Sequence, residues 1–456
     1  MAASTMNWEG GRKQPPRAPG PRPTVRLPLD HWGLRAGEQG LQLGSVSISD
    51  LADRLGTPFY LFDEERLRAN ARQARDAVAE AGLSAELYYS LKTNPHRRVL
   101  EILCEEGLGA EVISSRELET ALGVGYQADR IVFNGPGKSD RDLELAVESG
   151  VLVHTESASE AADLARIVES SGKAVRTGVR VNPDVFDDTA PNGLRMGRRG
   201  SVFGLDPAGP GFREAIRTLD QCPETRLISL SAHIGTGITT TEPFRHLAHA
   251  LVAVQRQLAN DGVAIDLLDF GGGFAVSSEV RHGHGAFDSL LAPDEMVQTP
   301  PPEAIATFAD CCSVIAVALS DTGSACLFEP GRLLVSDTFH LVTRVIRVKE
   351  EAGTCFAVLD AGRVQNALFV GRGFHEIVLV NDPYRPRRRP WTLAGPLCAD
   401  FDVFASDRML PDFAEGDLVA VLDVGAYNLS AQSSWSFDPA PVFDVADPGA
   451  RPPGVG

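Results

Sequence analysis

The sequence lacks several features that would define its class at once. No run of apolar residues approaches the roughly 20 that are needed to span a bilayer, so a membrane segment is not expected. Basic residues are in the minority, with 43 lysines and arginines against 61 aspartates and glutamates and a net charge of −18. Because a general nucleic-acid-binding protein needs a basic surface, neither nucleic acid nor membrane is an expected partner.

Cysteine is sparse and shows no metal-binding or disulfide pattern. There are seven cysteines, an odd number without any CxxC spacing. A disulfide framework or a zinc site is therefore not expected, and a reducing cytoplasm is the predicted compartment. Residues 1–25 are rich in Pro, Gly and Arg without an apolar stretch, which predicts a disordered tail rather than a secretory signal.

From residue 47 onward, short apolar segments alternate with amphipathic ones. Such alternation predicts parallel strands joined by helices, and near-equal repeats favour a (β/α)8 TIM-type barrel over an open doubly wound sheet. Nine strands are predicted, one more than a barrel needs, so one is expected to lie outside it. They are 59–62, 86–90, 110–113, 130–133, 151–154, 175–181, 227–232, 265–270 and 326–329.

After Gly331 the pattern changes to strands separated by Gly, Pro and Asp, which predicts a C-terminal all-β domain. The predicted domains are a tail (1–25), a segment joining the β domain (26–45), the barrel (46–331) and a β-sandwich or barrel-like domain (332–456). An arginine-rich run at 385–390 is interpreted as a solvated loop, with a docking patch for an acidic partner as the alternative.

Lys92 ends the predicted strand of the segment Tyr-Tyr-Ser-Leu-Lys-Thr-Asn-Pro. An ammonium group among apolar neighbours is costly unless it is paired or its pKa is lowered. A lysine with a lowered pKa forms imines with aldehydes. The alternative is a lysine whose stem lines the strand while its head reaches solvent.

Other polar residues also follow predicted strands, at the barrel end where chemistry gathers. They are Glu111, Asn134, Arg180, His233, Gly271 to Gly273, and Glu329. The glycines allow backbone N–H groups to approach a phosphate, although many glycine runs are plain turns. An imine lysine, a phosphate cradle and an acid for a ring nitrogen together are what pyridoxal 5'-phosphate requires.

Six motifs occur in a familiar order. They are Tyr-Ser-Leu-Lys92-Thr-Asn, His233-Ile-Gly-Thr-Gly, Asp269-Phe-Gly-Gly-Gly-Phe, Glu329-Pro-Gly-Arg, Gly395-Pro-Leu-Cys398 and Gly425-Ala-Tyr427. Over residues 45–445 the chain resembles the fold-type III pyridoxal-phosphate decarboxylases, the group of ornithine, arginine and diaminopimelate decarboxylases. The resemblance implies release of CO2 from an L-amino acid through an imine on Lys92 and a quinonoid intermediate. An alanine-racemase-type racemase and a catalytically silent cofactor-binding protein are the alternatives.

The resemblance also implies roles for individual residues. His233 stacks on the cofactor ring and Glu329 pairs with its nitrogen, while Glu111 replaces an aspartate of the family. The implied cofactor-binding set is Lys92, Glu111, Arg180, His233, Thr236, Gly272, Gly273, Glu329, Gly331, Arg332 and Tyr427. The implied catalytic residues are Lys92, His233, Glu329 and Cys398.

Cys398 is expected to come from the partner subunit of a head-to-tail homodimer with shared active sites, and to return a proton to Cα. Arg332, Asp400, Asp402 and Tyr427 are the expected substrate residues.

The substrate end departs from the family. Ala399 stands where the family carries an acidic residue, and the segment that begins at Asn366 lacks the Arg-Pro of diaminopimelate enzymes. The expected substrate is an ornithine-, lysine- or diaminopimelate-like amino acid or an amino acid joined to another group, and standard diaminopimelate is disfavoured. His282 and His284, in a long loop at 276–302, are interpreted as exposed residues rather than metal ligands.

Overall fold

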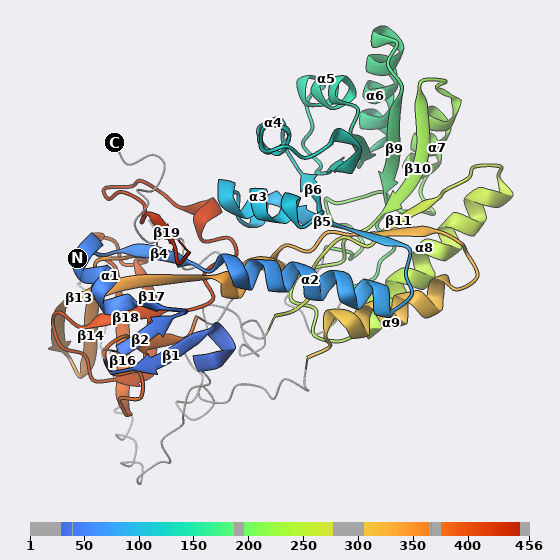
Figure 1. Cartoon of the computed structure of the whole chain (residues 1–456). Coiled ribbons are helices and arrows are strands. Elements are labelled where there is room, and N and C mark those ends of the chain that lie inside the picture. The colour runs from blue at the N-terminus through green and yellow to red at the C-terminus, as the bar shows by residue number, and fades with distance from the viewer. Residues whose placement is uncertain are drawn as a thin grey trace, which may run out of the picture.

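The computed structural model describes residues 29–38, 40–186, 196–276, 305–363, 366 and 375–446. The predicted tail, the histidines of the long loop and residues 367–369 lie outside the described residues. The described chain forms two lobes, a barrel wrapped by helices and a smaller lobe built of strands (Figure 1).

Eight parallel strands close into a barrel in the order β10-β11-β12-β5-β6-β7-β8-β9. This confirms the predicted barrel and rules out the open sheet. Its strands are β5 (Ala85–Ser90), β6 (Gly109–Val112), β7 (Ile131–Phe133), β8 (Leu152–Thr155), β9 (Val175–Arg180), β10 (Thr225–Ser231), β11 (Leu267–Asp269) and β12 (Ala325–Phe328). Because all run in one direction, the residues that follow them meet at a single end of the barrel.

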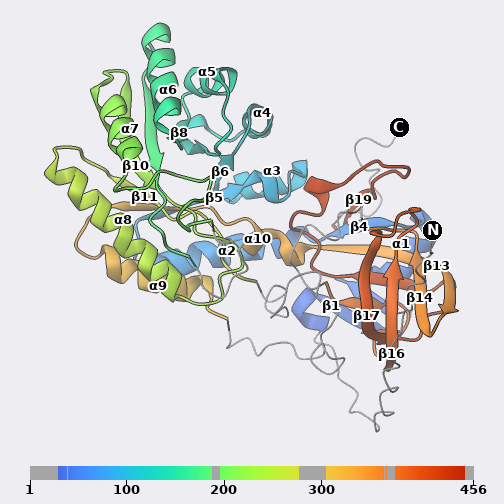
Figure 2. The ribbon, with the colours of Figure 1, turned by 180° about the vertical axis from the view of Figure 1, so that it is seen from behind.

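Helices cover the outside of the barrel (Figure 2). They are α2 (Glu64–Glu80), α3 (Arg97–Glu105), α4 (Ser115–Val124), α5 (Asp140–Ser149), α6 (Ala158–Ser171), α7 (Pro210–Gln221), α8 (Glu242–Asn260) and α9 (Phe308–Leu319), with a short α10 (Arg332–Val335) after the last strand. Serine side chains at 114, 139 and 157 cap three of them, as the sequence predicts. Thr307 and Asp310 form a capping box that begins α9 at Phe308.

The second lobe is all β, as predicted. Its main sheet runs β15-β18-β13-β14-β16-β17, with β4 beside β13 and β19 beside β4. The strands are β4 (Phe59–Phe62), β13 (Phe339–Glu351), β14 (Thr354–Leu359), β15 (Ile377–Leu379), β16 (Arg387–Ala394), β17 (Val403–Pro411), β18 (Leu418–Val421) and β19 (Val442–Asp444). The sequence prediction missed β17 and β19.

The N-terminal part of the chain packs against this β lobe. Strands β1 (Leu34–Gly37), β2 (Gly40–Leu43) and β3 (Val46–Ser47) form a small sheet, followed by α1 (Ile48–Leu55). Buried side chains of this region share one apolar cluster with those of β13, β15 and β18.

Strand β4 is the surplus ninth strand, and it pairs with β13 and β19 rather than with the barrel. Residues 46–62, assigned to the barrel from the sequence, therefore belong structurally to the β lobe; the other domain limits stay a prediction.

Arginines of the basic run are paired within the β lobe. Arg387 and Arg389 lie in β16 rather than in a loop, which corrects the interpretation of this stretch. The side chains of Arg385, Arg387 and Arg389 form ion pairs with acidic residues of neighbouring segments. A basic docking patch is therefore not supported, because three of its cations are neutralised internally.

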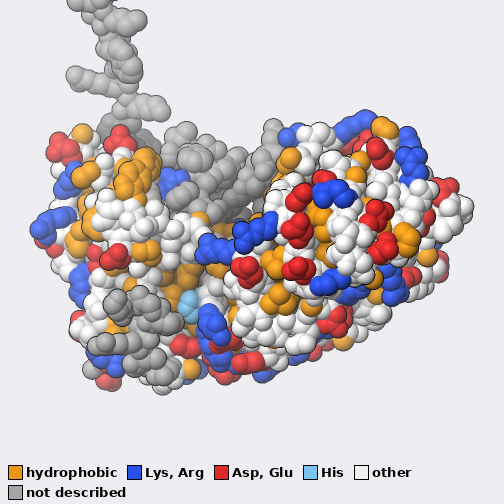
Figure 3. Space-filling model, turned by 90° about the horizontal axis from the view of Figure 1, so that it is seen from above, with side chains coloured by type: hydrophobic (Ala, Val, Ile, Leu, Met, Phe, Trp, Pro, Cys, Tyr) orange, Lys and Arg blue, Asp and Glu red, His pale blue; other side chains and the backbone are white. Residues whose placement is uncertain are grey.

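The outer surface mixes charges of both signs. On the face drawn in Figure 3, acidic and basic side chains alternate over the barrel lobe. Within the described residues, no helix is both long and apolar enough to cross a membrane.

Candidate active site

A cavity of about 470 Å³ opens at the carboxyl ends of the barrel strands. This volume lies in the range of small-molecule sites. All eleven residues of the expected cofactor-binding set line it: Lys92, Glu111, Arg180, His233, Thr236, Gly272, Gly273, Glu329, Gly331, Arg332 and Tyr427. The fold thus brings together residues that are separated by more than 300 positions in the sequence.

Lys92 lies in a short 3-10 turn (Leu91–Thr93) directly after β5. Its Nζ is 2.5 Å from Oε2 of Glu111 and 2.7 Å from Oγ of Ser90. Burial is the largest single influence and lowers the pKa of Lys92, but the charges of Glu111, Tyr427 and Glu329 together outweigh burial, so the net shift of the pKa is upward. Of the two expected ways to accommodate this charge, the structure shows pairing rather than a lowered pKa, because Glu111 holds the ammonium form.

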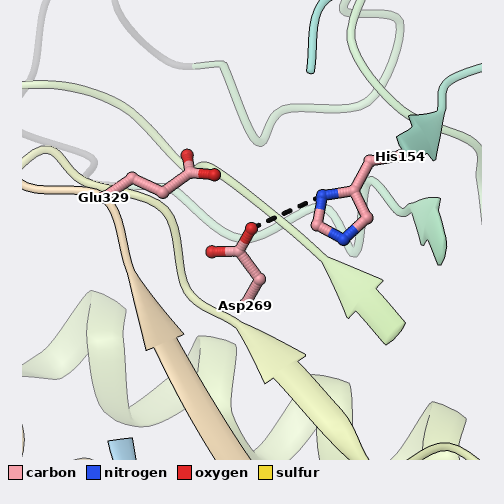
Figure 4. A group of neighbouring side chains, drawn as sticks. All are labelled: His154, Asp269 and Glu329. Atoms are coloured by element: carbon pink, nitrogen blue, oxygen red, sulfur yellow. Dashed lines mark ion pairs between the residues drawn. The ribbon is translucent and has the colours of Figure 1, made fainter. Parts of the chain in front are cut away.

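Glu329 follows β12 and presents a buried carboxyl group to the cavity. Burial, followed by the charges of Asp269 and Glu111, raises the pKa of Glu329 well above its usual value. Burial likewise raises the pKa of Asp269 to about 7. Figure 4 shows the two carboxyl groups side by side at the ends of neighbouring strands. Such a pair favours a cationic or proton-donating partner in the cavity.

His233 and the glycine run meet above β10 and β11. The backbone N–H of Gly272 donates to Nδ1 of His233 over 3.1 Å, so Nε2 carries the proton of the neutral ring. Burial, with the charges of Arg180 and Lys92, lowers the pKa of His233 to about 3. The imidazole therefore stays neutral at physiological pH and offers a flat face rather than a charge.

Gly273 tests whether the glycine run is a cradle or only a turn. It has φ +94°, and a Cβ there would overlap the carbonyl oxygen of Gly235. We expect Gly273→Ala to weaken binding of pyridoxal phosphate by about tenfold or more, as measured by quenching of protein fluorescence in a titration. Gly323→Ala is the matched control, because Gly323 also has positive φ but a Cβ there meets nothing within 4 Å. Equal affinities of the two variants would contradict a cradle at Gly273.

Two arginines lie at the cavity wall and are held by aromatic rings. Arg180 donates to Oε1 of Glu156 over 2.8 Å and its guanidinium lies 4.8 Å from the ring centre of Phe203. Arg332 lies 5.0 Å from the ring centre of Tyr427. Tyr427 has φ +65°, an uncommon backbone conformation for a residue with a side chain. Its N–H donates to the carbonyl oxygen of Thr93 over 2.7 Å, which ties the β lobe to the turn that carries Lys92.

Three expected site residues do not line this cavity. Cys398 and Asp400 are exposed on the β lobe. Asp402 is buried in its own loop, where its carboxylate accepts from the backbone N–H groups of Arg363 (2.6 Å) and Leu397 (2.9 Å). The carboxylate of Asp402 thus stabilises the loop that presents Cys398, which disagrees with an expected contact to substrate.

Sequence reasoning missed a polar cluster beneath the cavity. His154, Asp269 and Glu329 offer polar atoms that all lie within 4.8 Å of one another, and His154 Nδ1 is 3.6 Å from Asp269 (Figure 4). A histidine inside a buried strand was the available signal. Its two ring nitrogens already bond to Asn134 (2.8 Å) and Ser229 (2.9 Å), so the ring has no lone pair left for a metal.

The cavity also has an apolar wall that the sequence did not reveal. Ile113, Met196, Phe203 and Leu333 are among the residues that line it. Ile113 keeps 41% of its surface exposed, which is unusual for a large apolar side chain. An apolar wall of this kind suits a substrate part without charge.

The chain is similar to known proteins over most of its length. Residues 64–336 match the family model described as pyridoxal-dependent decarboxylase, pyridoxal binding domain. The chain is 31% identical over 409 residues to diaminopimelate decarboxylase of Methanothermobacter thermautotrophicus, covering 88% of this chain and 89% of the relative. It is 30% identical over 407 residues to L-glutamyl-[BtrI acyl-carrier protein] decarboxylase of Niallia circulans, covering 86% and 88%. The structure of Helicobacter pylori diaminopimelate decarboxylase complexed with L-lysine superposes with a TM-score of 0.74 at 26% identity, covering 88% and 94%.

Proposed function

The chain belongs to the pyridoxal-dependent decarboxylases, and from this premise we propose which residues carry its reaction and which amino acid it acts on. It is a pyridoxal-phosphate-dependent carboxy-lyase that releases CO2 from an amino acid. The racemase and the silent-protein alternatives are not favoured, since the relatives are decarboxylases. The observation that carries the residue assignment is the meeting of Lys92, Glu329 and the glycine run in one cavity.

The cavity fits pyridoxal phosphate in shape and in chemistry. At Gly272 and Gly273 a Cβ would overlap backbone oxygens, and at Gly331 it would overlap the Thr93 hydroxyl, so only glycine fits these positions, and their closely packed backbone would form the phosphate cradle. Thr236 and Tyr427 border the same cradle and would hold the phosphate with it. Glu329 would hold the ring nitrogen, and the neutral face of His233 would support the ring.

When bound, the cofactor supplies an aldehyde for the amine and a ring that accepts the electron pair of the broken Cα–carboxylate bond. The residues of the chain prepare the cavity for this chemistry. Glu111, 2.5 Å from Lys92 Nζ, pairs with the ammonium form of that lysine and holds its Nζ at the cavity. The buried carboxylate form of Glu329 is stabilised only beside a positive charge, so it favours the protonated state of a ring nitrogen.

A second subunit would complete the site. Cys398 is exposed and absent from the cavity of its own chain, although the family resemblance gives it the role of proton donor. We therefore propose a head-to-tail homodimer in which Sγ of the partner's Cys398 protonates Cα after CO2 leaves. Exposed Phe401 and Trp435, whose ring centres lie 5.9 Å apart, adjoin this loop and would be covered in the dimer.

The substrate we propose is an L-amino acid whose distal end does not form an ion pair with the protein. Ala399 offers no carboxylate, Asp402 is engaged in its own loop, and the cavity wall at Ile113, Met196 and Phe203 is apolar. An amino acid joined to another group through its side chain meets these conditions. The relative that acts on L-glutamyl-[BtrI acyl-carrier protein] shows that such a conjugate occurs among proteins of similar sequence.

A substrate panel followed by CO2 release tests this proposal. It contains lysine, ornithine, arginine, meso-diaminopimelate and glutamate conjugated through its side-chain carboxyl to a thiol or amine carrier. We expect kcat/KM for the conjugate to exceed that for meso-diaminopimelate by about 100-fold or more. The reason is that the charged distal end of meso-diaminopimelate would enter the site without an ion-pair partner. A clear preference for meso-diaminopimelate would contradict the proposal and leave the decarboxylase assignment intact.

All seven cysteines of the chain are free thiols. This supports a reducing compartment, for which we propose the cytoplasm.

A further inference from the structure

The polar side chains beneath the cavity form one continuous hydrogen-bonded chain. Asn134, after β7, donates from Nδ2 to Oε1 of Glu329 over 2.5 Å and more weakly to Oε1 of Glu111 over 3.4 Å. Its Oδ1 faces Nδ1 of His154 at 2.8 Å, and Nε2 of that ring faces Oγ of Ser229 at 2.9 Å. One asparagine thus joins the carboxyl group that contacts Lys92 to the one assigned to the ring nitrogen.

The positions of the protons along this series of hydrogen bonds follow from the two carboxyl groups at one end of it. Two carboxyl groups on one side of Asn134 require the NH2 group there, so Oδ1 points at His154. Nδ1 of His154 must then carry the proton, Nε2 must accept, and the Ser229 hydroxyl must donate. Burial, with the charges of Lys138 and Arg180, lowers the pKa of His154 to about 3, which agrees with a neutral ring.

The space for this imidazole is built into the barrel. His154 and Ser229 are completely buried. A Cβ at position 178, in the strand between them, would lie 2.6 Å from Cδ2 of His154 and 2.7 Å from Cβ of Ser229. The absence of a side chain at Gly178 therefore leaves a slot that fits the imidazole and holds it in one orientation.

We propose that Asn134, His154 and Ser229 act as a positioning relay that fixes the side chain of Glu329 and keeps its carboxylate form available to the cofactor. The proposal rests on the ring-nitrogen role proposed above for Glu329. Asn134 supplies a donor to a carboxyl group that burial and two neighbouring acids otherwise drive towards the neutral form. His154 and Ser229 prevent the amide from turning its oxygen towards that carboxyl group.

Other charged groups around Glu329 set the background for a pH measurement. Asp269 and Glu111 disfavour the carboxylate, while the cation of Lys92 favours it. Arg180 favours the carboxylate of Asp269, which lies beside Glu329. Ser229→Ala alters none of these groups and adds no charge, so a change in its pH profile reports on the relay.

The test uses Ser229→Ala and Asn134→Asp in the full-length chain. Ser229→Ala removes one buried oxygen and releases the ring, whereas Asn134→Asp replaces the NH2 donor by a third acid. We expect both to weaken pyridoxal-phosphate binding by fluorescence titration, by about tenfold in Asn134→Asp and several-fold in Ser229→Ala. Both should move the acid limb of the kcat profile to higher pH, because less carboxylate is present at a given pH.

Thr155→Val is the matched control. Thr155 is equally buried, lies next to His154 on β8, and its hydroxyl donates to Gly178 outside the relay. We expect its cofactor affinity and acid limb to equal those of the wild type. Ser229→Ala keeps the test decisive if aspartate at 134 prevents folding. Wild-type affinity and acid limb in Ser229→Ala would overturn the relay.

Glu329→Gln separates the two proposals. If this variant also binds the cofactor like the wild type with an unchanged acid limb, the assigned role of Glu329 fails. If Glu329→Gln is impaired and Ser229→Ala is not, only the relay fails.

Discussion

Lys92→Ala is expected to abolish the visible absorbance of the cofactor-loaded protein and to reduce decarboxylation by about 1,000-fold or more. The physical reason is that Lys92 carries the amine at the cavity, where the carboxylate of Glu111 holds it at 2.5 Å. The measurements are an absorbance spectrum after addition and dialysis of pyridoxal phosphate, and CO2 release. Retained absorbance in the variant would remove Lys92 from its proposed role.

The lysine that forms the imine can be identified by chemical labelling, because the chain contains few lysines. It contains five lysines, at positions 13, 92, 138, 173 and 349. Among the described ones, Lys138 is buried against Glu160 at 2.7 Å, and Lys173 is exposed. Borohydride reduction of the loaded protein followed by peptide mapping should therefore label position 92 alone.

Two further variants separate chemistry from folding. Lys92→Arg keeps a cation beside Glu111, whereas Lys92→Ala leaves that buried carboxylate without its ion-pair partner. We expect Lys92→Ala to lose about 1–3 kcal/mol of unfolding free energy, less than for a fully buried pair because water reaches Lys92. Lys92→Arg should retain most of that stability and still bind no cofactor covalently. Lys173→Ala should match the wild type in every measurement.

Mixing Lys92→Ala and Cys398→Ala subunits is expected to restore about a quarter of the wild-type activity. Each variant alone has two damaged sites in a dimer with shared active sites. With random exchange, half of the dimers are mixed, and each mixed dimer has one site with both Lys92 and the partner's Cys398 intact. The measurement is CO2 release after co-expression or after mild unfolding and refolding of the mixture.

Cys104→Ala is the control for this experiment. Cys104 is half-buried on α3, away from the proposed interface, so its alanine variant should be active by itself. Absence of rescue, while the Lys92→Ala and wild-type subunits exchange normally, would argue against a shared site and place the protonating group within one chain.

The barrel and its site were predictable because the required signals are local. Lys92, His233 and Glu329 each follow an apolar segment, and parallel strands that close into a barrel bring such residues to one end. The domain to which a strand belongs was predicted wrongly where pairing decides it. The segment of β4 has the same local pattern as a barrel strand, and only its partners β13 and β19 place it elsewhere.

Electrostatic properties were less predictable than positions. The raised pKa of Lys92 depends on the side chain of Glu111, nineteen residues away in the sequence and on the next strand. The relay at His154 depends on Asn134 after β7, on Ser229 in β10, and on a glycine of β9 that makes room for the ring. Asp402 looked available for substrate, yet backbone N–H groups occupy both its oxygens. Such properties depend on contacts that no sequence pattern encodes locally.

Strand β4 has a consequence for the order in which the protein acquires its structure during synthesis. Its four side chains are fully buried, and Phe62 pairs with Phe339, which leaves the ribosome only after the whole barrel. At ordinary translation rates this apolar strand waits roughly ten seconds to a minute for its first partner. A nascent chain halted at the end of the barrel would present an unpaired apolar edge, the kind of surface that chaperones protect and that otherwise aggregates.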